Sequence, residues 1–379
     1  MSKNEKQLRI LLKKKIINIM GHDIFLSRLD NLRQTLANKG LDGIFITNLT
    51  SVRYISGFTG SAGSCLITED ESYFISDGRY DVQSEKQVNN MIRYIDFGNH
   101  ISIIEKNKLI KDGQNLAFEG DHTSFSQYKA ITDSFPDVEW KSTSMLMENL
   151  QAVKDNYEIS AIRTAVEITD VIYEEILPML KPGITEKEVA NQLVLRYRQE
   201  SDGEAYNPIV AGGENGALPH AVPSDRPFKD GDFIVIDAAA KYQGYHADMT
   251  RTPLIGKPSD RHYEIYEIVK GSQQAGCDAA KAGVSCKEMD TITRDYITQR
   301  GYGEFYNHGT GHGLGLEIHT EPRMSQLSTQ TLNKNNVVTI EPGIYLPGWG
   351  GVRIEDDIII KKDGCEILNK TSKELVVLS

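Results

Sequence analysis

Four acidic side chains in this sequence follow short apolar runs, and their positions point to metal chemistry. Asp237 ends the run Phe233–Asp237, and Asp248 follows eleven positions later. Glu341 and Glu355 each follow a short run rich in β-branched residues. Such runs predict buried strands. A buried carboxylate without a partner is unfavourable, and the usual remedy is a hydrogen-bonded cation or a metal ion.

The acids form two pairs, and each pair flanks a predicted hairpin turn. Tyr242–Tyr245 lies between the two aspartates, and Pro347–Gly351 lies between the two glutamates. The acids of a pair should lie roughly opposite each other on paired strands, unless the register slips by one residue. Four like charges close together repel one another unless cations lie between them. The sequence therefore predicts a cation-binding centre built from two hairpins.

A histidine completes the predicted ligand set, which contains no thiolate. Such a set suits Mn²⁺, Co²⁺ or Zn²⁺ and disfavours a structural zinc site of the cysteine type. Four carboxylates need two divalent ions for neutrality, and paired ions in hydrolases lie about 3.5–4 Å apart, so that a carboxylate can bridge them. We expect two divalent metal ions, with Mn²⁺ as the first choice. The predicted ligands are Asp237, Asp248, His312, Glu341 and Glu355.

Hydrolysis of an amide is the chemistry that such a centre performs. A hydroxide bridging two ions is a strong nucleophile, because metals lower the pKa of bound water from about 15.7 toward about 7. The attacked carbonyl becomes an oxyanion that needs donors where charge develops, and His220 and His319 are the candidates. Glu341 is predicted to act both as a ligand and as the general base that passes a proton to the leaving amine.

Other polar residues nearby have supporting roles or none. Arg353 shares a strand face with Glu355, so it either orients and neutralises the ligands or forms a plain ion pair. His308 is a candidate for a similar supporting contact. Asp356 and Asp357 are expected to face solvent or to support the ligands from behind. Taken singly, most such residues are ordinary capping, surface or core residues; the prediction rests on their combination.

The glycine-rich stretch Gly309–Gly313 could instead indicate a phosphate-binding loop. It does not satisfy GxGxxG, and no GK[ST] follows it. Glycine here more plausibly lets the backbone around His312 approach the centre closely.

Composition limits the class of protein. The length of 379 residues allows two domains. A formal net charge of −11 argues against nucleic acid as the main partner. No run approaches the roughly 18–20 apolar residues of a membrane span. The four cysteines have no metal-binding spacing, which fits a reduced, cytoplasmic protein with free thiols.

The chain divides into an extension and two predicted domains. Residues 1–23 form a basic extension, interpreted as a solvated helix rather than a secretory signal, with a targeting segment or a translation start at Met20 as the alternatives. Residues 24–148 alternate helical and strand patterns and predict an α/β domain. Residues 149–379 predict an α+β domain that starts with a long helix after the capping box at Asp155 and Glu158.

The second domain contains an internal echo. Lys181–Val189 resembles Lys281–Met289 at an offset of 100 positions, and both stretches pair a turn glycine with a capping box. Similar offsets relate His220 to His319, Asp237 to Glu341, and Asp248 to Glu355. We infer two similar halves related by a pseudo-two-fold axis, with the acids meeting between them.

These motifs resemble the pita-bread metallopeptidases, which include aminopeptidase P, prolidase, methionine aminopeptidase and the metal-free creatinase. The resemblance covers nearly the whole chain after about residue 24. It implies five dinuclear-metal ligands at the positions named above, with Asp248 and Glu355 bridging both ions, and two substrate-contacting histidines. The matching stretches are Asn215–His220, Asp237, Asp248, His308–His319, Glu341–Gly343, Gly351–Asp356, Arg53–Ser61 and Asp77–Tyr80.

The first-domain motifs resemble the proline-specific members, which implies a metallo-exopeptidase, most directly an Xaa-Pro aminopeptidase. An X–Pro bond is a tertiary amide of fixed shape, which explains the use of a special enzyme. The alternatives are an Xaa-Pro dipeptidase (prolidase), a non-catalytic peptide-binding protein of the same fold, and metal-independent hydrolysis like that of creatinase. A homodimer is expected by family likeness.

Overall fold

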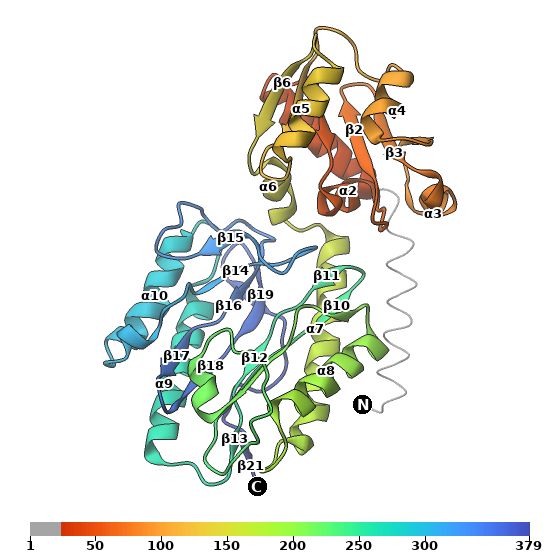
Figure 1. Ribbon diagram of the computed structural model, residues 1–379. Coiled ribbons are helices and arrows are strands. Elements are labelled where there is room, and N and C mark those ends of the chain that lie inside the picture. The colour runs from red at the N-terminus through yellow and green to blue at the C-terminus, as the bar shows by residue number, and fades with distance from the viewer. Residues whose placement is uncertain (1–23) are drawn as a thin grey trace. The chain divides into compact units, whose positions relative to one another are not determined.

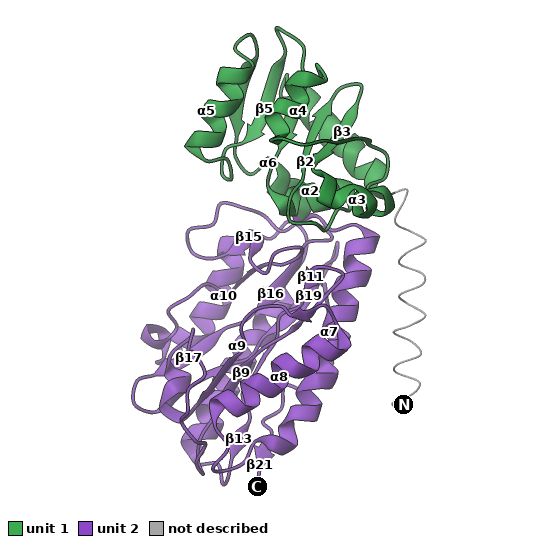
Figure 2. Ribbon diagram, turned by 45° about the vertical axis from the view of Figure 1, so that its right-hand side comes forward, with its two compact units in different colours: residues 1–151 green, residues 152–379 purple. Residues whose placement is uncertain are grey.

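The structure, a computed structural model, describes residues 24–379, so the expected basic extension over residues 1–23 lies outside the described residues. The chain splits into two compact units, with a boundary between Gln151 and Ala152 (Figure 2). In the described part of the chain, no helix is long and apolar enough to cross a membrane.

Unit 1 is built on a mixed six-stranded sheet with the order β4-β3-β2-β1-β5-β6. β1 runs parallel to β5 and antiparallel to β2. A helix runs through residues 24–38, and its leucines at positions 29, 32 and 36 are buried, as their spacing predicts. The elements are β1 (Gly43–Ile46), α2 (Leu49–Ser56), β2 (Ser64–Thr68), β3 (Ser72–Ser76), η1 (Gly78–Tyr80), α3 (Asp81–Gln87), β4 (Ile92–Ile95), α4 (His100–Lys106), β5 (Asn115–Glu119), α5 (Phe125–Ser134), β6 (Glu139–Thr143) and α6 (Leu146–Ala152).

Unit 2 begins with helices and continues into hairpins, twice over (Figure 1). Its first half contains α7 (Asn156–Ile176), η2 (Leu177–Met179), α8 (Glu186–Glu200), β7 (Gly203–Glu204), β8 (Ile209–Gly212), η3 (Gly213–Ala217), β9 (Ile234–Asp237), β10 (Ala240–Tyr242), β11 (Tyr245–His246), β12 (Thr250–Arg251) and β13 (Leu254–Ile255). Its second half contains α9 (Asp260–Ala279), α10 (Cys286–Thr298), η4 (Gly303–Phe305), β14 (Gly311–Gly313), β15 (Thr320–Met324), β16 (Val337–Ile340), β17 (Gly343–Leu346), β18 (Gly350–Arg353), β19 (Asp356–Ile360), β20 (Cys365–Ile367) and β21 (Val377–Leu378).

The two halves of unit 2 repeat each other in detail. Gly183 and Gly283 both have φ = 92°. Two positions after these glycines, Thr185 caps α8 and Ser285 caps α10. The two capping residues also form matching isolated bridges, with Pro227 and Thr331 respectively. Both hydrogen bonds of the capping box are present in α8. In α10 only one is present, which the Glu288 backbone N–H donates to the Ser285 side chain. The predicted second box is therefore half formed.

Helices α9 and α10 cover the strands of the second half, as Figure 1 shows. Cys277 of α9 and Met289 of α10 pack with Val338, Ile340 and Ile358 in one buried cluster. This packing positions β16, which ends directly before Glu341, and β19, which begins directly after Glu355.

The two hairpins form as predicted but differ in register. Gln243 and Gly244 join β10 to β11 with φ of 50° and 78°, the left-handed conformations that a two-residue hairpin turn requires. Asp237 pairs with Thr250 rather than with Asp248. The expected opposition of the two aspartates is thus shifted by two residues, which keeps both on one face because side chains alternate along a strand.

The glutamate hairpin has the expected register. Gly343 pairs with Arg353, and Ile340 pairs with Asp356. Both pairings continue one register, in which Glu341 lies opposite Glu355.

Candidate metal centre

The five predicted ligands line one cavity of about 920 Å³ in unit 2. One ligand atom each from Asp248, His312 and Glu355 lie within 4.8 Å of one another. Nε2 of His312 lies 3.4 Å from an oxygen of Glu341 and 3.6 Å from an oxygen of Asp248. The structure thus brings the predicted residues together around one space; their role as ligands stays a prediction.

Tyr206 connects Asp237 with this group. Its hydroxyl contacts Oδ1 of Asp237 and lies 2.5 Å from Oδ1 of Asp248. A hydroxyl has one proton and can donate it to only one carboxylate at a time. The other carboxylate therefore needs a further partner, which Asp237 has in Arg353.

His312 is positioned by close packing of its strand. A Cβ on Gly311 would lie 2.2 Å from the Thr339 carbonyl oxygen, and one on Gly313 would lie 2.2 Å from that of Glu321. Glycine on both sides of the histidine thus lets β14 fit between β15 and β16. Nδ1 of His312 lies 3.0 Å from the Gly313 carbonyl oxygen, to which it donates. Nε2 is left as an acceptor directed at the acids.

The electrostatics of the centre call for a cation. Burial raises the pKa of Asp248 and Glu355 well above the ordinary range, and repulsion from neighbouring acids adds to this. Burial also raises the pKa of Glu341 to about 8 and lowers that of His312 to about 3. Four acids thus face a neutral imidazole, and this set of oxygen and nitrogen donors fits divalent metal ions.

Arg353 forms an ion pair with one predicted ligand and contacts a side chain that bonds to another, which fits both roles considered for it; its orienting role stays a prediction. It is buried, and its Nη2 donates to Asp237 over 2.7 Å. Its Nε donates to Oγ1 of Thr250 over 3.0 Å, and this hydroxyl donates to Glu355 over 2.6 Å. One arginine therefore links an acid of each hairpin.

His308 supports Arg353 from behind. Its Nδ1 donates to the Gly309 carbonyl, so its Nε2 accepts from the Tyr345 hydroxyl at 2.7 Å. That hydroxyl in turn accepts from Nη1 of Arg353 at 2.9 Å. Burial lowers the pKa of His308 to about 4, which keeps it neutral.

The two candidate catalytic histidines lie on the open side of the same cavity. His220 and His319 both line it, and both are exposed. The His319 ring centroid lies 4.3 Å from that of His312. They are placed to meet a substrate that enters from solvent.

Asp356 and Asp357 do not face solvent, so that part of the expectation is wrong. Both are fully buried because β19 is covered on both faces. Asp357 accepts from the backbone N–H of Asp248 over 2.9 Å, and Asp356 forms an ion pair with Arg251 over 2.7 Å. Both support the centre from behind.

Four supporting residues were missed in the sequence: Tyr206, Thr250, Thr339 and Tyr345. Thr250 and Thr339 lie two positions from an acid on the same strand face, and Oγ1 of Thr339 lies 3.3 Å from Glu341. The two-residue alternation could have identified both threonines. Tyr206 has no such signal, since it lies on a loop far from the acids in sequence.

An α/β unit followed by two similar halves, whose hairpins gather acids around a histidine, is the architecture of a metal-dependent hydrolase. Comparison with known proteins makes this specific: the chain belongs to metallopeptidase family M24, whose model matches residues 160–362. The model of the Creatinase/Prolidase N-terminal domain matches residues 28–153. The predicted family, the pita-bread fold and the class of metallopeptidase are confirmed.

Relatives cover nearly the whole chain. It is 40% identical to the uncharacterized peptidase YqhT of Bacillus subtilis over 353 residues, which are 93% of this chain and 100% of the relative. It is similar to the structure of an Xaa-Pro dipeptidase from Bacillus anthracis, with 42% identity, a TM-score of 0.89, and coverage of 93% and 100% of the two chains. It is also similar to that of an X-Pro aminopeptidase from Thermotoga maritima, with 39% identity, a TM-score of 0.84, and coverage of 89% and 98%.

Proposed function

We propose that this protein is an Xaa-Pro dipeptidase that hydrolyses the bond between an N-terminal residue and a C-terminal proline. The observation that carries this proposal is Arg323, a cation in the wall of the cavity. It favours the dipeptidase over the Xaa-Pro aminopeptidase, to which the sequence motifs pointed first.

Among the described residues that line the cavity, Lys187, Arg323 and Arg353 carry a positive charge, and they differ in how available they are to a ligand. Arg353 is buried against Asp237. Lys187 is paired with Asp225 over 2.8 Å. Arg323 has a 57% exposed side chain, and its Nε lies 3.7 Å from the nearest oxygen of Glu321. Its guanidinium can therefore bind a carboxylate in the bidentate geometry that arginine favours.

Only a dipeptide carries its carboxylate next to the scissile bond. In Xaa-Pro the free carboxylate follows the proline ring directly, whereas in a longer peptide a neutral amide occupies that position. An arginine in the cavity wall therefore gains a charge-assisted hydrogen bond with the dipeptide alone, worth about 1.5–3 kcal/mol.

We propose that Asp237, Asp248, His312, Glu341 and Glu355 hold two divalent ions, with Mn²⁺ as the first choice. When bound, the ions supply an activated water as nucleophile and polarise the substrate carbonyl. Glu341 would take a proton from the attacking water and pass it to the proline nitrogen, which must leave as a protonated amine.

The histidines and the arginine complete the reaction geometry. His220 and His319, on the solvent side, donate hydrogen bonds to the substrate carbonyl as negative charge develops on its oxygen. Arg323 fixes the other end of the dipeptide. Arg353 and Thr250 hold the acids of the two hairpins in a fixed orientation.

We further propose a reducing compartment and a homodimer. All four cysteines are free thiols, and Cys65, Cys277 and Cys286 are buried, which suits a cytoplasmic protein. The homodimer rests on family likeness alone.

The test compares Ala-Pro with Ala-Pro-Ala using the metal-reconstituted protein before and after chelation. We expect cleavage of the dipeptide only, and none after chelation. The change Arg323→Ala should raise KM for Ala-Pro about 10- to 100-fold, whereas Arg198→Ala, at an exposed arginine outside the cavity wall, should leave it unchanged.

Other outcomes would identify the alternatives. Efficient cleavage of Ala-Pro-Ala without dependence on Arg323 would establish the aminopeptidase, which the exposed cavity and the Thermotoga maritima relative favour. Peptide binding without turnover in Mn²⁺ or Co²⁺ would indicate a binding protein. Activity that survives chelation would indicate metal-independent hydrolysis.

A further inference from the structure

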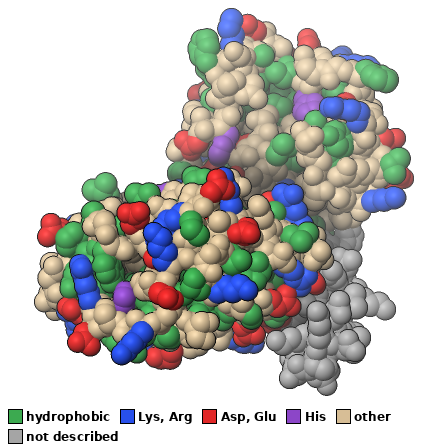
Figure 3. All heavy atoms as spheres, turned by 60° about the horizontal axis from the view of Figure 1, so that its bottom comes forward, with side chains coloured by type: hydrophobic (Ala, Val, Ile, Leu, Met, Phe, Trp, Pro, Cys, Tyr) green, Lys and Arg blue, Asp and Glu red, His purple; other side chains and the backbone are tan. Residues whose placement is uncertain are grey.

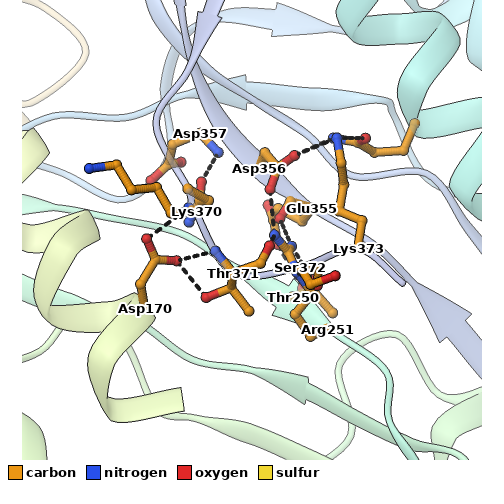
Figure 4. Close-up of polar contacts among 12 residues, drawn as sticks. Asp170, Thr250, Arg251, Glu355, Asp356, Asp357, Lys370, Thr371, Ser372 and Lys373 are labelled. Atoms are coloured by element: carbon orange, nitrogen blue, oxygen red, sulfur yellow. Dashed lines mark hydrogen bonds and ion pairs between the residues drawn. The ribbon is translucent and has the colours of Figure 1, made fainter. Parts of the chain in front are cut away.

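The predicted ligand Glu355 is supported by an arginine that does not itself line the cavity. Arg251 is only 2% exposed and is the largest fully buried side chain among the described residues. Figure 4 shows it between Glu355 and a segment near the carboxyl terminus, Lys370–Lys373, here called the terminal segment. A buried guanidinium is tolerated only when its donors are satisfied, so its partners reveal what it holds together.

Every N–H donor of Arg251 is used. Nε donates to the Ser372 carbonyl over 3.2 Å, and Nη2 donates to the Thr371 carbonyl over 2.9 Å. Nη1 donates to the carbonyls of Thr250, over 2.9 Å, and Glu355, over 2.5 Å. The remaining bond, from Nη2 to Asp356, is an ion pair of 2.7 Å. Five donors thus join the terminal segment to the strand end that carries Glu355.

The same contacts fix Glu355 from three directions. Its backbone N–H donates to the Thr250 carbonyl over 3.1 Å, and its carbonyl accepts from Arg251. Its Oε2 accepts from the Thr250 hydroxyl over 2.6 Å. Once the backbone and one carboxylate oxygen are held, the orientation of the other oxygen toward the cavity is determined.

The terminal segment is itself fastened at both ends, as Figure 4 shows. At one end, Asp170 of α7 accepts from the backbone N–H groups of Lys370 and Thr371, over 2.8 and 3.2 Å, and from the Thr371 hydroxyl over 2.7 Å. At the other end, Lys373 donates to Gln273 of α9 over 2.8 Å and pairs with Asp356 over 3.0 Å. The segment therefore spans from the first helix of one half to the first helix of the other.

We propose that the terminal segment is a positioning element of the metal centre and that Arg251 transmits its position to Glu355. Neither contributes an atom to the cavity wall. The proposal rests on the metal-binding role of Glu355 in the proposed function. Groups that orient a metal ligand from outside change metal affinity about 10- to 100-fold when they are altered.

The experiment measures metal binding rather than activity alone. The full-length protein is stripped of metal and titrated with Mn²⁺ by calorimetry, as wild type and as the variants Arg251→Lys and Thr371→Val. Lysine keeps the charge beside Asp356 but has three donors on one atom instead of five on a planar fork. Thr371→Val removes only the hydroxyl that donates to Asp170. This variant should therefore still fold if Arg251→Lys does not.

Arg251→Lys should weaken binding of at least one ion about 10- to 100-fold. Thr371→Val should also weaken Mn²⁺ binding, by a smaller factor. The far-ultraviolet circular dichroism of both should be unchanged, and kcat should fall without a change in KM. The matched control is Arg163→Lys, at a partly buried pair with Glu366 outside the cavity wall, and should bind both ions as the wild type does.

The outcomes separate the two proposals. Wild-type affinity for both ions in a folded Arg251→Lys would overturn the positioning role, and so would wild-type affinity in Thr371→Val if Arg251→Lys does not fold. A wild-type protein that binds no metal would overturn the proposed function, and the positioning role with it.

Discussion

The free energy of unfolding of the chelated protein should depend on pH in a range where that of the metal-loaded protein does not. The cause is the group of buried acids in the cavity. Glu341 has its pKa raised by burial to about 8, and Asp248 and Glu355 have theirs raised further. A folded state that binds protons more tightly than the unfolded chain loses stability as pH rises through that pKa.

Two buried histidines act in the opposite direction, but only at lower pH. The pKa values of His308 and His312 fall to about 4 and about 3, because burial favours the neutral ring. The unfolded chain binds protons on these rings up to a pH of about 6.5, so stability rises with pH below that value. Above pH 6.5 the histidine contribution levels off within about one pH unit. Burial lowers the pKa of Lys154 to about 8, which adds a smaller rise of stability near that pH, so the acids dominate the slope.

The magnitude follows from Glu341. Between pH 6.5 and 8 the unfolded chain has released the Glu341 proton while the folded state still binds most of it. A window of about 1.5 pH units therefore corresponds to about 2 kcal/mol of unfolding free energy at ~1.4 kcal/mol per unit. Bound divalent ions keep the acids ionised, so this dependence should disappear when metal is added.

The assay is urea denaturation at pH 6.5, 7.0, 7.5 and 8.0, with chelator and with saturating Mn²⁺. We expect the chelated protein to lose at least about 2 kcal/mol across this range, and the loaded protein to lose little. Glu341→Gln should reduce the loss in the chelated protein. Equal slopes with and without metal, or a chelated protein whose stability rises with pH, would refute the reasoning.

Two further predictions concern the centre itself. Glu341→Gln should lower kcat about 10²- to 10⁴-fold, because an amide cannot carry the proton; substantial turnover in steady-state assays would remove Glu341 from the role of general base. His312→Ala should lower metal content below the two ions per chain expected of the wild type, as measured by elemental analysis; two tightly bound ions in this variant would show that the histidine is not a ligand.

Much of the catalytic unit could be predicted because its signals are local. The acids end apolar runs, and turn glycines mark the hairpins. The capping box at Asp155 and Glu158 forms as expected. In unit 1 the alternation of helical and strand patterns predicts the α/β class, but β6 (Glu139–Thr143) gives no such signal, since it is a largely exposed edge strand without an apolar run.

What could not be predicted depends on long-range packing. The offset that places Thr250 opposite Asp237 is an exception, because it follows from the turn at Gln243 and Gly244: the pairs Tyr242 with Tyr245 and Asp237 with Thr250 belong to one continuous register. The burial of Asp356 depends on Arg251 and on a lysine near the carboxyl terminus. Arg323 was not assigned because only the folded chain brings it into the cavity wall.

The surface carries no comparable signal on the face seen in Figure 3, where acidic and basic side chains are interspersed among the described residues.

The division of the centre between two similar halves has a mechanical consequence. Asp237 and Asp248 belong to the first half, whereas His312, Glu341 and Glu355 belong to the second. In the proposed site neither half supplies all five ligands, so binding of the ions would also stabilise the packing of the two halves of unit 2 against each other. The ions would then link the two halves of unit 2 as well as take part in the reaction.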